Sequence, residues 1–184
     1  PETTQYLMKT LREMGYEPQE IAPCSVVATV GTGKGKTFLL RSDSDALPMD
    51  ELSGLEYASC HPGQAHACGH DMHAAMLLGA AKLLKERESE LNGTVKLMFQ
   101  PGEEIFAGCR PMIEAGLLEN PKVDASMAIH TDASMKLGAL GTCVGNMSTS
   151  VDGFRITIHG KGSHGAQPQN SIDPVNIGAH VVLA

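Results

Sequence analysis

Four short stretches of the sequence combine carboxylate, imidazole or thiol side chains, the groups that bind metal ions or move protons. They read RSDSDALP, HACGHD, FQPGEE and SMAIHTD, and each lies at the end of an apolar strand pattern or at the start of a helical one. The carboxyl ends of parallel strands meet at one edge of a sheet, where α/β folds bind their ligands. We therefore predict that these stretches contribute to one site.

The stretch HACGHD supplies a thiol and an imidazole from Cys68 and His70, which flank a single glycine. This spacing lets both side chains turn toward one cation at the start of the helix that follows. A closed structural zinc site would need a second Cys/His pair at a defined spacing, whereas Cys60 lies eight residues before Cys68 and the other cysteines are more distant. The spacing therefore favours a catalytic metal site. Three nearby imidazoles remain candidates for supporting or surface roles: His61, His66 and His73.

Carboxylates follow two of the predicted strands. Glu103 and Glu104 are adjacent after a Pro-Gly turn, so one can ligate a metal ion while the other stays free as a general base. Asp43 and Asp45 alternate, so both face one side while the strand geometry lasts, and they could ligate a metal or orient a ligating imidazole. His130 ends the pattern SMAIH. Each of these features is more often structural when it occurs alone, so the prediction depends on their convergence.

Strand and helix patterns alternate along most of the chain, which predicts an α/β layer with a largely parallel sheet. The expected elements are helix 7–14, strands 24–30 and 36–43, helix 71–91, strand 93–101, helix 110–119 and strand 123–130. The link GTGKG between the first two strands is typical of a β-hairpin, which would add an antiparallel part. It lacks the Lys-Ser/Thr ending of a phosphate-binding loop.

The character of the sequence changes near residue 145, where small polar residues precede the alternating pattern FRITIH at 154–159. This alternation predicts an antiparallel strand with one solvated face. We predict a metal-binding catalytic domain over residues 1–148 and the start of a second domain over residues 149–184. The chain begins with Pro1 and ends at Ala184 within a helical pattern, so we expect it to be a piece of a longer protein.

The composition argues against several kinds of partner. The net charge is −7 and the 14 Lys and Arg residues are scattered, which disfavours nucleic-acid binding. No apolar run approaches the roughly 18 residues that span a bilayer, and the first residues lack the pattern of a signal peptide. The five cysteines are odd in number and irregularly spaced, which indicates reduced thiols. We therefore expect a cytoplasmic protein with no nucleic-acid or membrane partner.

Five motifs in order resemble those of the cocatalytic metallopeptidases, a family that includes aminoacylases, hippurate hydrolases, carboxypeptidases and indole-acetyl-amino-acid hydrolases. The motifs are RSDSDALP, HACGHDMH, QPGEE, AIHTD and GKGSHGAQP, and they are most similar to the hippurate hydrolase branch. The resemblance covers nearly the whole chain. It implies a three-layer α/β/α, zinc-peptidase-like catalytic domain with a mixed sheet, followed by the start of a smaller α+β lid and dimerisation domain.

The resemblance also implies roles for individual residues. The implied metal ligands are Cys68, His70, Glu104 and His130. Glu103 matches the general base and Asp45 matches the aspartate that orients a ligand. Cys68 replaces the bridging aspartate of other branches, and Asp43 stands where those branches have a ligating histidine. His164 matches a lid-domain histidine that reaches across a dimer to polarise the scissile carbonyl. The cofactors would be two divalent ions of Zn, Mn, Co or Ni, with a final histidine ligand outside this chain.

The resulting prediction is a homodimeric, metal-dependent amidohydrolase that cleaves N-acyl amino acids with a metal-activated water and Glu103 as the base. The same chemistry suits a dipeptidase or carboxypeptidase, and the sequence does not separate these substrates. An alternative of another class is a non-catalytic metal-binding module, against which the intact ligands and Glu103 argue. We expect this chain alone to bind fewer ions than the complete protein, and to be inactive by itself if the missing ligand is essential.

Overall fold

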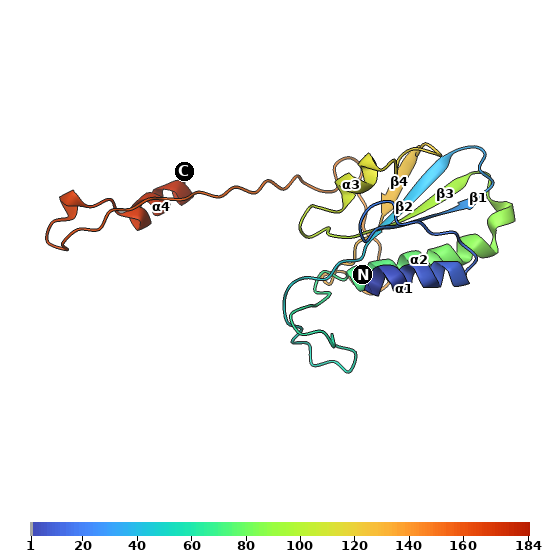
Figure 1. Cartoon of the computed structure of the whole chain (residues 1–184), viewed down its shortest axis with the longest axis horizontal. Helices are drawn as coiled ribbons and strands as arrows, with labels where there is room; N and C mark the ends of the chain where they lie inside the picture. Colours follow the sequence, from blue (N-terminus) through green and yellow to red (C-terminus); the bar gives the residue numbers. More distant parts are fainter. Residues whose placement is uncertain (1) are drawn as a thin grey trace. The chain divides into compact units, whose positions relative to one another are not determined.

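The computed structural model describes residues 2–184, which form two compact units (Figure 1). The first unit extends to Lys136 and the second comprises Leu137–Ala184. No helix of the described part is both long enough and apolar enough to cross a membrane.

The first unit is built on a four-stranded mixed sheet with the order β1-β3-β2-β4. The strands are β1 (Val26–Gly31), β2 (Thr37–Asp43), β3 (Thr94–Gln100) and β4 (Ala125–Ala128). β2 pairs in parallel with both β3 and β4, whereas β1 pairs antiparallel with β3. The carboxyl ends of β2, β3 and β4 therefore meet at one edge of the sheet (Figure 1).

Helices cover both faces of this sheet. α1 (Glu2–Glu13) and α2 (His70–Glu86) lie on one face, and α3 (Cys109–Glu114) lies on the other (Figure 1). A short 3-10 helix, η1 (Glu88–Glu90), follows α2. One core cluster joins the first two helices to β1 and β3, and a second joins α3 to β2 and β3. This arrangement confirms the predicted α/β class with a mixed sheet in three layers.

The first helix ends as its sequence predicts. The N–H groups of Gly15 and Tyr16 donate to the carbonyls of Arg12 and Leu11 at 2.9 and 3.0 Å, which is a Schellman cap with Gly15 in the left-handed region (φ 84°). The buried Tyr16 hydroxyl then donates to the Ala81 carbonyl at 2.7 Å. This bond ties the end of α1 to α2, the helix that carries the site.

The hairpin predicted for β1 and β2 is wrong, because β3 lies between these strands. The link over residues 32–36 wraps around the start of β3: the Thr32 N–H donates to the Gly93 carbonyl, and the Thr94 N–H donates to the Lys36 carbonyl. A Cβ on Gly31 or Gly93 would collide with the backbone opposite. Glycines that are typical of a tight turn instead permit this close crossing, since β3 is buried and needs a hydrogen-bonded neighbour on each side.

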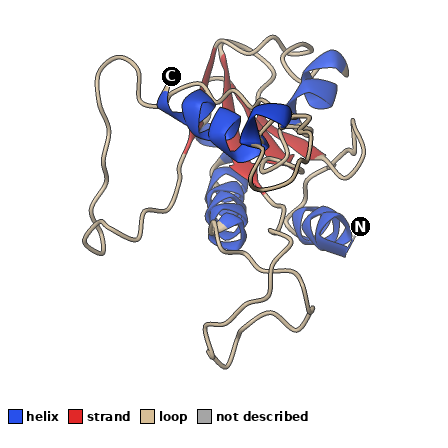
Figure 2. Ribbon diagram, turned by 90° about the vertical axis from the view of Figure 1, so that its left-hand side faces the viewer, coloured by secondary structure: helices blue, strands red, loops and turns tan. Residues whose placement is uncertain are grey.

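A long loop over residues 44–69 joins β2 to α2 and extends away from the sheet (Figure 2). An isolated bridge between Leu47 and Ala65 brings its two ends together. The chain thus returns to the edge where β2 ended. Gly69 then adopts the left-handed region (φ 79°) and α2 begins at His70.

The second unit contains a short 3-10 helix, η2 (Pro168–Asn170), and a helix, α4 (Pro174–Leu183). The Asp173 side chain caps α4 by accepting the N–H groups of Val175 and Asn176 at 2.9 and 3.3 Å. Residues 154–159 do not form the predicted strand, because no neighbouring strand pairs with them among the described residues. The domain boundary predicted at residues 148–149 stays a prediction.

Candidate metal centre

The carboxyl ends of three strands and the start of α2 supply the predicted site residues. The four ends are Asp43 in β2, Gln100 in β3, Ala128 in β4 and His70 in α2. The other predicted residues of this region lie within four positions of one of these ends: Asp45, Cys68, Glu103, Glu104 and His130. Parallel strands end at one edge, so segments distant in the chain become neighbours here.

Three groups of possible metal ligands in the described residues contain His70, and two of them consist of predicted ligands and the predicted base. Cys68, His70 and His130 have ligand atoms within 4.8 Å of one another, and so do His70, Glu103 and Glu104. The structure therefore brings together the four predicted metal ligands and the predicted general base. Their roles stay predictions, but within each group the ligand atoms are close enough to share a cation.

Asp45 holds the ring of His70. The Nδ1 atom of His70 lies 3.0 Å from the Asp45 carbonyl oxygen and 3.3 Å from its Oδ1. Both oxygens are acceptors, so Nδ1 carries the proton and Nε2 keeps a lone pair. The other carboxylate oxygen of Asp45 accepts the N–H of Glu104 at 3.2 Å. Asp45 thus orients two of the possible ligands, His70 through its backbone carbonyl and Glu104 through its carboxylate.

The Nε2 atom of His70 is the best indication of a cation site. The residue is 1% exposed, and Nε2 is buried without a hydrogen-bond partner. It lies 3.6 Å from Oε1 of Glu104 and 3.7 Å from Oδ2 of Asp43. Nε2 thus faces two acceptor oxygens and no proton donor, an arrangement that is costly unless a cation satisfies it, and of the two carboxylates that of Asp43 is already paired with Arg41. The residues present therefore fit a bound metal ion.

Cys68 and His130 form the exposed side of this centre. The Cys68 Sγ lies 3.4 Å from Nε2 of His130, and Nδ1 of His130 donates to the Thr131 carbonyl at 2.7 Å. The second nitrogen of His130 therefore faces the thiol as an acceptor. Burial, followed by Glu104, Glu103 and Asp43, raises the pKa of Cys68 to about 11. A thiolate ligand at neutral pH would thus require a cation that offsets the carboxylates.

Asp43, His70 and His73 also have ligand atoms within 4.8 Å, but the His73 ring of this third group already has a partner for each nitrogen. The Nδ1 atom of His73 donates to Oδ1 of Asp43 at 2.6 Å, and its Nε2 accepts the Thr131 N–H at 2.9 Å. Both ring nitrogens are used, so His73 has no lone pair left for a metal.

Asp43 stays ionised in this setting. Burial alone would raise the pKa of its carboxyl group, but the hydrogen bond from His73 and the charge of Arg41 outweigh burial and lower the pKa. Nη1 of Arg41 lies 2.9 Å from Oδ2 of Asp43. A buried carboxylate is thereby kept negative beside the candidate centre.

Arg41 and Thr131 are absent from the predicted site residues, although local signals exist for both. Arg41 alternates with Asp43 on β2 and so faces the same side, and Thr131 directly follows His130. Two of the remaining histidines lie outside the possible metal groups of the described residues: His61, which is exposed, and His66, which is half-buried.

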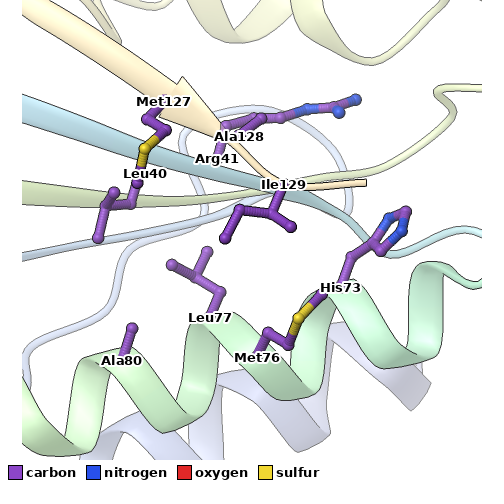
Figure 3. A pocket seen from close by; sticks show the side chains of 9 residues that line it. All are labelled: Leu40, Arg41, His73, Met76, Leu77, Ala80, Met127, Ala128 and Ile129. Atoms are coloured by element: carbon purple, nitrogen blue, oxygen red, sulfur yellow. The ribbon is translucent and has the colours of Figure 1, made fainter. Parts of the chain in front are cut away.

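Two hollows adjoin the centre. One of about 540 Å³ is lined by Glu103 and by residues around α3, including Phe106, Arg110 and Ile113. The other, of about 110 Å³, lies between α2 and β4 and is almost wholly apolar, with His73 at one end (Figure 3). Of these two hollows, only the one beside α3 is lined by a predicted catalytic side chain, that of Glu103.

His164 lies in the second unit, where its ring is exposed and Nδ1 accepts the Ala166 N–H at 3.2 Å. Its predicted role at a partner's active site stays a prediction.

The profile of peptidase family M20/M25/M40 matches residues 39–182, which include every candidate ligand. The chain belongs to this family. The match confirms the resemblance that the five motifs carry. The matched part of this M20 chain includes the carboxyl ends of β2, β3 and β4 as well as the segment around His164.

Two relatives are similar over the whole chain. It is 42% identical to an N-acetyl-L-cysteine deacetylase of Bacillus subtilis and covers 44% of that protein. It is 45% identical to the IAA-amino acid hydrolase ILR1-like 5 of Arabidopsis thaliana and covers 42% of it. The M20 chain thus spans less than half the length of these relatives.

Solved structures give the same result. The B. subtilis YXEP protein, described as a dinuclear metal-binding peptidase of the M20 family, is 40% identical over 72% of this chain and 37% of its own, with a TM-score of 0.68. A putative aminohydrolase from methicillin-resistant Staphylococcus aureus is 32% identical over 99% of this chain and 49% of its own, with a TM-score of 0.78.

Proposed function

We propose that this M20 chain carries the metal-binding half of an amidohydrolase that cleaves the amide bond of N-acyl amino acids. The observation that carries the proposal is the buried, unpartnered Nε2 of His70 among acidic oxygens, close to a thiol and a second imidazole. The names of the relatives support the substrate class, since an acetyl-cysteine and an indole-acetyl amino acid both contain an amide between an acyl group and an amino acid.

The proposed metal ligands are Cys68, His70, Glu104 and His130. The dinuclear metal centre of the B. subtilis neighbour supports two divalent ions in the complete protein. Bound divalent ions would lower the pKa of a water molecule and polarise the substrate carbonyl. The thiol favours softer ions, but availability and geometry decide among zinc, manganese, cobalt and nickel.

Glu103 is the proposed general base. It lines the hollow of about 540 Å³, whereas the backbone of its neighbour Glu104 is held by Asp45. A carboxylate at this position can take a proton from the attacking water and deliver it to the leaving amine. His164 of a second subunit would donate to the developing oxyanion, a contribution of about 3–4 kcal/mol for donors of this kind. The homodimer and the cytoplasmic location are part of the proposal.

A Glu103→Gln variant of the complete protein tests this assignment. We expect it to keep its metal content and to lose about 10²–10⁴-fold in turnover of N-acetyl amino acids, because the shape of the side chain is kept while its basicity is lost. Metal analysis and steady-state kinetics would measure both properties. Full turnover with both ions bound would refute the role of Glu103. A wild-type protein that binds both ions but hydrolyses no N-acyl amino acid or peptide would instead support the alternative of a metal-binding module without catalysis.

A peptidase activity is the second candidate, favoured by a carboxypeptidase relative. The thermostable carboxypeptidase 2 of Saccharolobus solfataricus is 42% identical over 99% of this chain. Assays of N-acyl amino acids beside dipeptides and peptide carboxyl termini would separate the two. Faster hydrolysis of unblocked peptides would assign the chain to the peptidases.

A further inference from the structure

His73 is buried at the junction of three segments near the candidate metal centre. Its side chain projects from the first turns of α2 toward the strands, in line with Leu77 and Ala80 (Figure 3). The ring is 1% exposed and contacts Asp43 at the end of β2 and Thr131 beyond β4. This residue is not a candidate ligand, yet it touches the segments that carry the ligands.

The hydrogen bonds of His73 define its tautomer. The Thr131 backbone N–H can only donate, so Nε2 of His73, at 2.9 Å, must be unprotonated. The proton therefore lies on Nδ1 and is donated to Asp43 at 2.6 Å. The opposite oxygen of Asp43 meets Arg41 at 2.9 Å, and Nε of Arg41 donates to the Gln100 side chain at 3.0 Å. His73 is thus anchored to the framework of β2 and β3.

The other side of the ring holds the residues around His130. Thr131 receives the Nδ1 proton of His130 on its carbonyl and gives its own N–H to His73. The rings of His73 and His130 also pack with centroids 4.4 Å apart. The position of the His130 ring therefore depends on both contacts.

The same junction includes the residue after Cys68. A Cβ on Gly69 would collide with Oγ1 of Thr131, so the start of α2 and the turn after β4 are in close contact. The distance of 3.4 Å between Cys68 Sγ and His130 Nε2 lies across this junction.

We propose that His73 is a positioning residue that sets His130 against Cys68 by linking Asp43 to the Thr131 N–H. This inference rests on the proposed metal-dependent function, since its consequence is a pre-organised pair of ligands. Hydrogen-bonded supports of this kind typically change metal affinity by about 10–100-fold.

Two substitutions each remove one of the two hydrogen bonds of the His73 imidazole. His73→Asn keeps an amide near Nδ1, which can donate to Asp43, but it has no group to accept the Thr131 N–H. His73→Gln keeps an acceptor near Nε2 for Thr131, but it removes the donor to Asp43. His61→Asn is the matched control, because His61 is exposed and lies outside the possible metal groups of the described residues.

The complete protein would be titrated with Zn²⁺ against a chromophoric chelator. We expect His73→Asn to weaken zinc binding by about 10–100-fold and His73→Gln to weaken it only a few-fold. Urea unfolding of the metal-free proteins should show the opposite order, with Gln the less stable variant. If His73 acted by packing alone, the less stable variant would also bind zinc more weakly. Opposite orders of zinc affinity and stability in the two variants therefore identify a positioning role.

Hydrogen exchange of the Thr131 amide in the metal-free protein gives an independent measurement. The amide should exchange faster in His73→Asn than in His73→Gln or in His61→Asn. Unchanged zinc affinity in His73→Asn, or equal exchange in both His73 variants, would overturn the positioning role. A wild-type protein that binds no Zn²⁺ or other divalent ion would overturn the proposed function instead, and the exchange data would still decide the role of His73.

Discussion

The two ends of the strands, which form opposite edges of the sheet, differ in how their polar groups are paired. At the edge where β2 and β3 begin, Thr32 and Thr94 donate to the backbone opposite, and the Thr37 N–H donates to Oδ2 of Asp124 at 2.8 Å. At the edge where they end, most of the buried polar side-chain atoms without a partner are found. Among residues 2–184 they belong to Ser42, Asp45 and His70, with a fourth in His66 of the preceding loop, while Oδ2 of Asp43 has only the Arg41 guanidinium at 2.9 Å.

Unpartnered buried polar groups cost stability, so their concentration at one edge indicates that this edge is kept for a ligand. Asp124 and Asp45 show the contrast: both are aspartates next to a strand of the same sheet. The carboxylate of Asp124 accepts the N–H of Thr37 and so completes the backbone hydrogen bonding at the start of β2. Asp45 instead orients an imidazole whose second nitrogen has no partner. The partner of a polar group, more than its type, distinguishes a structural carboxylate from a functional one.

Removal of the free nitrogen should produce the largest effect. His70→Asn keeps a donor for Asp45 but lacks the atom that faces Glu104 and Asp43. We expect zinc affinity to fall by more than the roughly 10–100-fold that loss of a supporting contact costs. The metal-free protein should be at least as stable as the wild type, because an unpartnered atom is removed. Chelator competition and urea unfolding would test this, and a marked loss of stability with unchanged zinc binding would contradict it.

The pH dependence of metal binding should come next in size. The pKa of Cys68 is raised to about 11, so the metal-free thiol keeps its proton at neutral pH and must release it when it ligates. Zinc affinity should therefore rise by about tenfold per pH unit between pH 7 and 9 and fall as the pH is lowered. Zinc titrations at several pH values would measure the slope. Cys68→Asp should flatten it, since that carboxyl group is already ionised, and an equal slope in both proteins would argue against a thiolate ligand.

The smallest effect should come from the edge where the strands begin and the polar groups are paired. Asp124→Ala removes the acceptor of the buried Thr37 N–H and should lower the free energy of unfolding by about 1 kcal/mol. Zinc affinity should stay at the wild-type value, because Asp124 lies at the start of β4, away from the ligands at its end. Calorimetry of the metal-free protein and the same zinc titration would show both. A loss of zinc binding here would break the distinction between the edges.

Much of the fold follows from local sequence patterns. The helical spacing before Gly15, the buried pattern of β3 and the long apolar start of α2 each predict an element that the structure contains. The hairpin is the instructive error. Its glycines are a local signal for a turn. The pairing of β1 and β2 is instead determined by β3, which is distant in the sequence and whose buried side chains need strands on both sides.

The sequence by itself determined the membership of the M20 family, the α/β class and the stretches that supply the candidate centre. The family resemblance named His70 rather than His73 as a ligand, but only the tertiary structure gave the physical distinction between these residues, which lie three positions apart on one helix face. Asp43 and Thr131 satisfy both nitrogens of His73, whereas Asp45 satisfies one nitrogen of His70 and leaves the other free. The reason is physical: a histidine's capacity to bind a metal depends on which hydrogen bonds its ring already makes, and those partners come from distant strands.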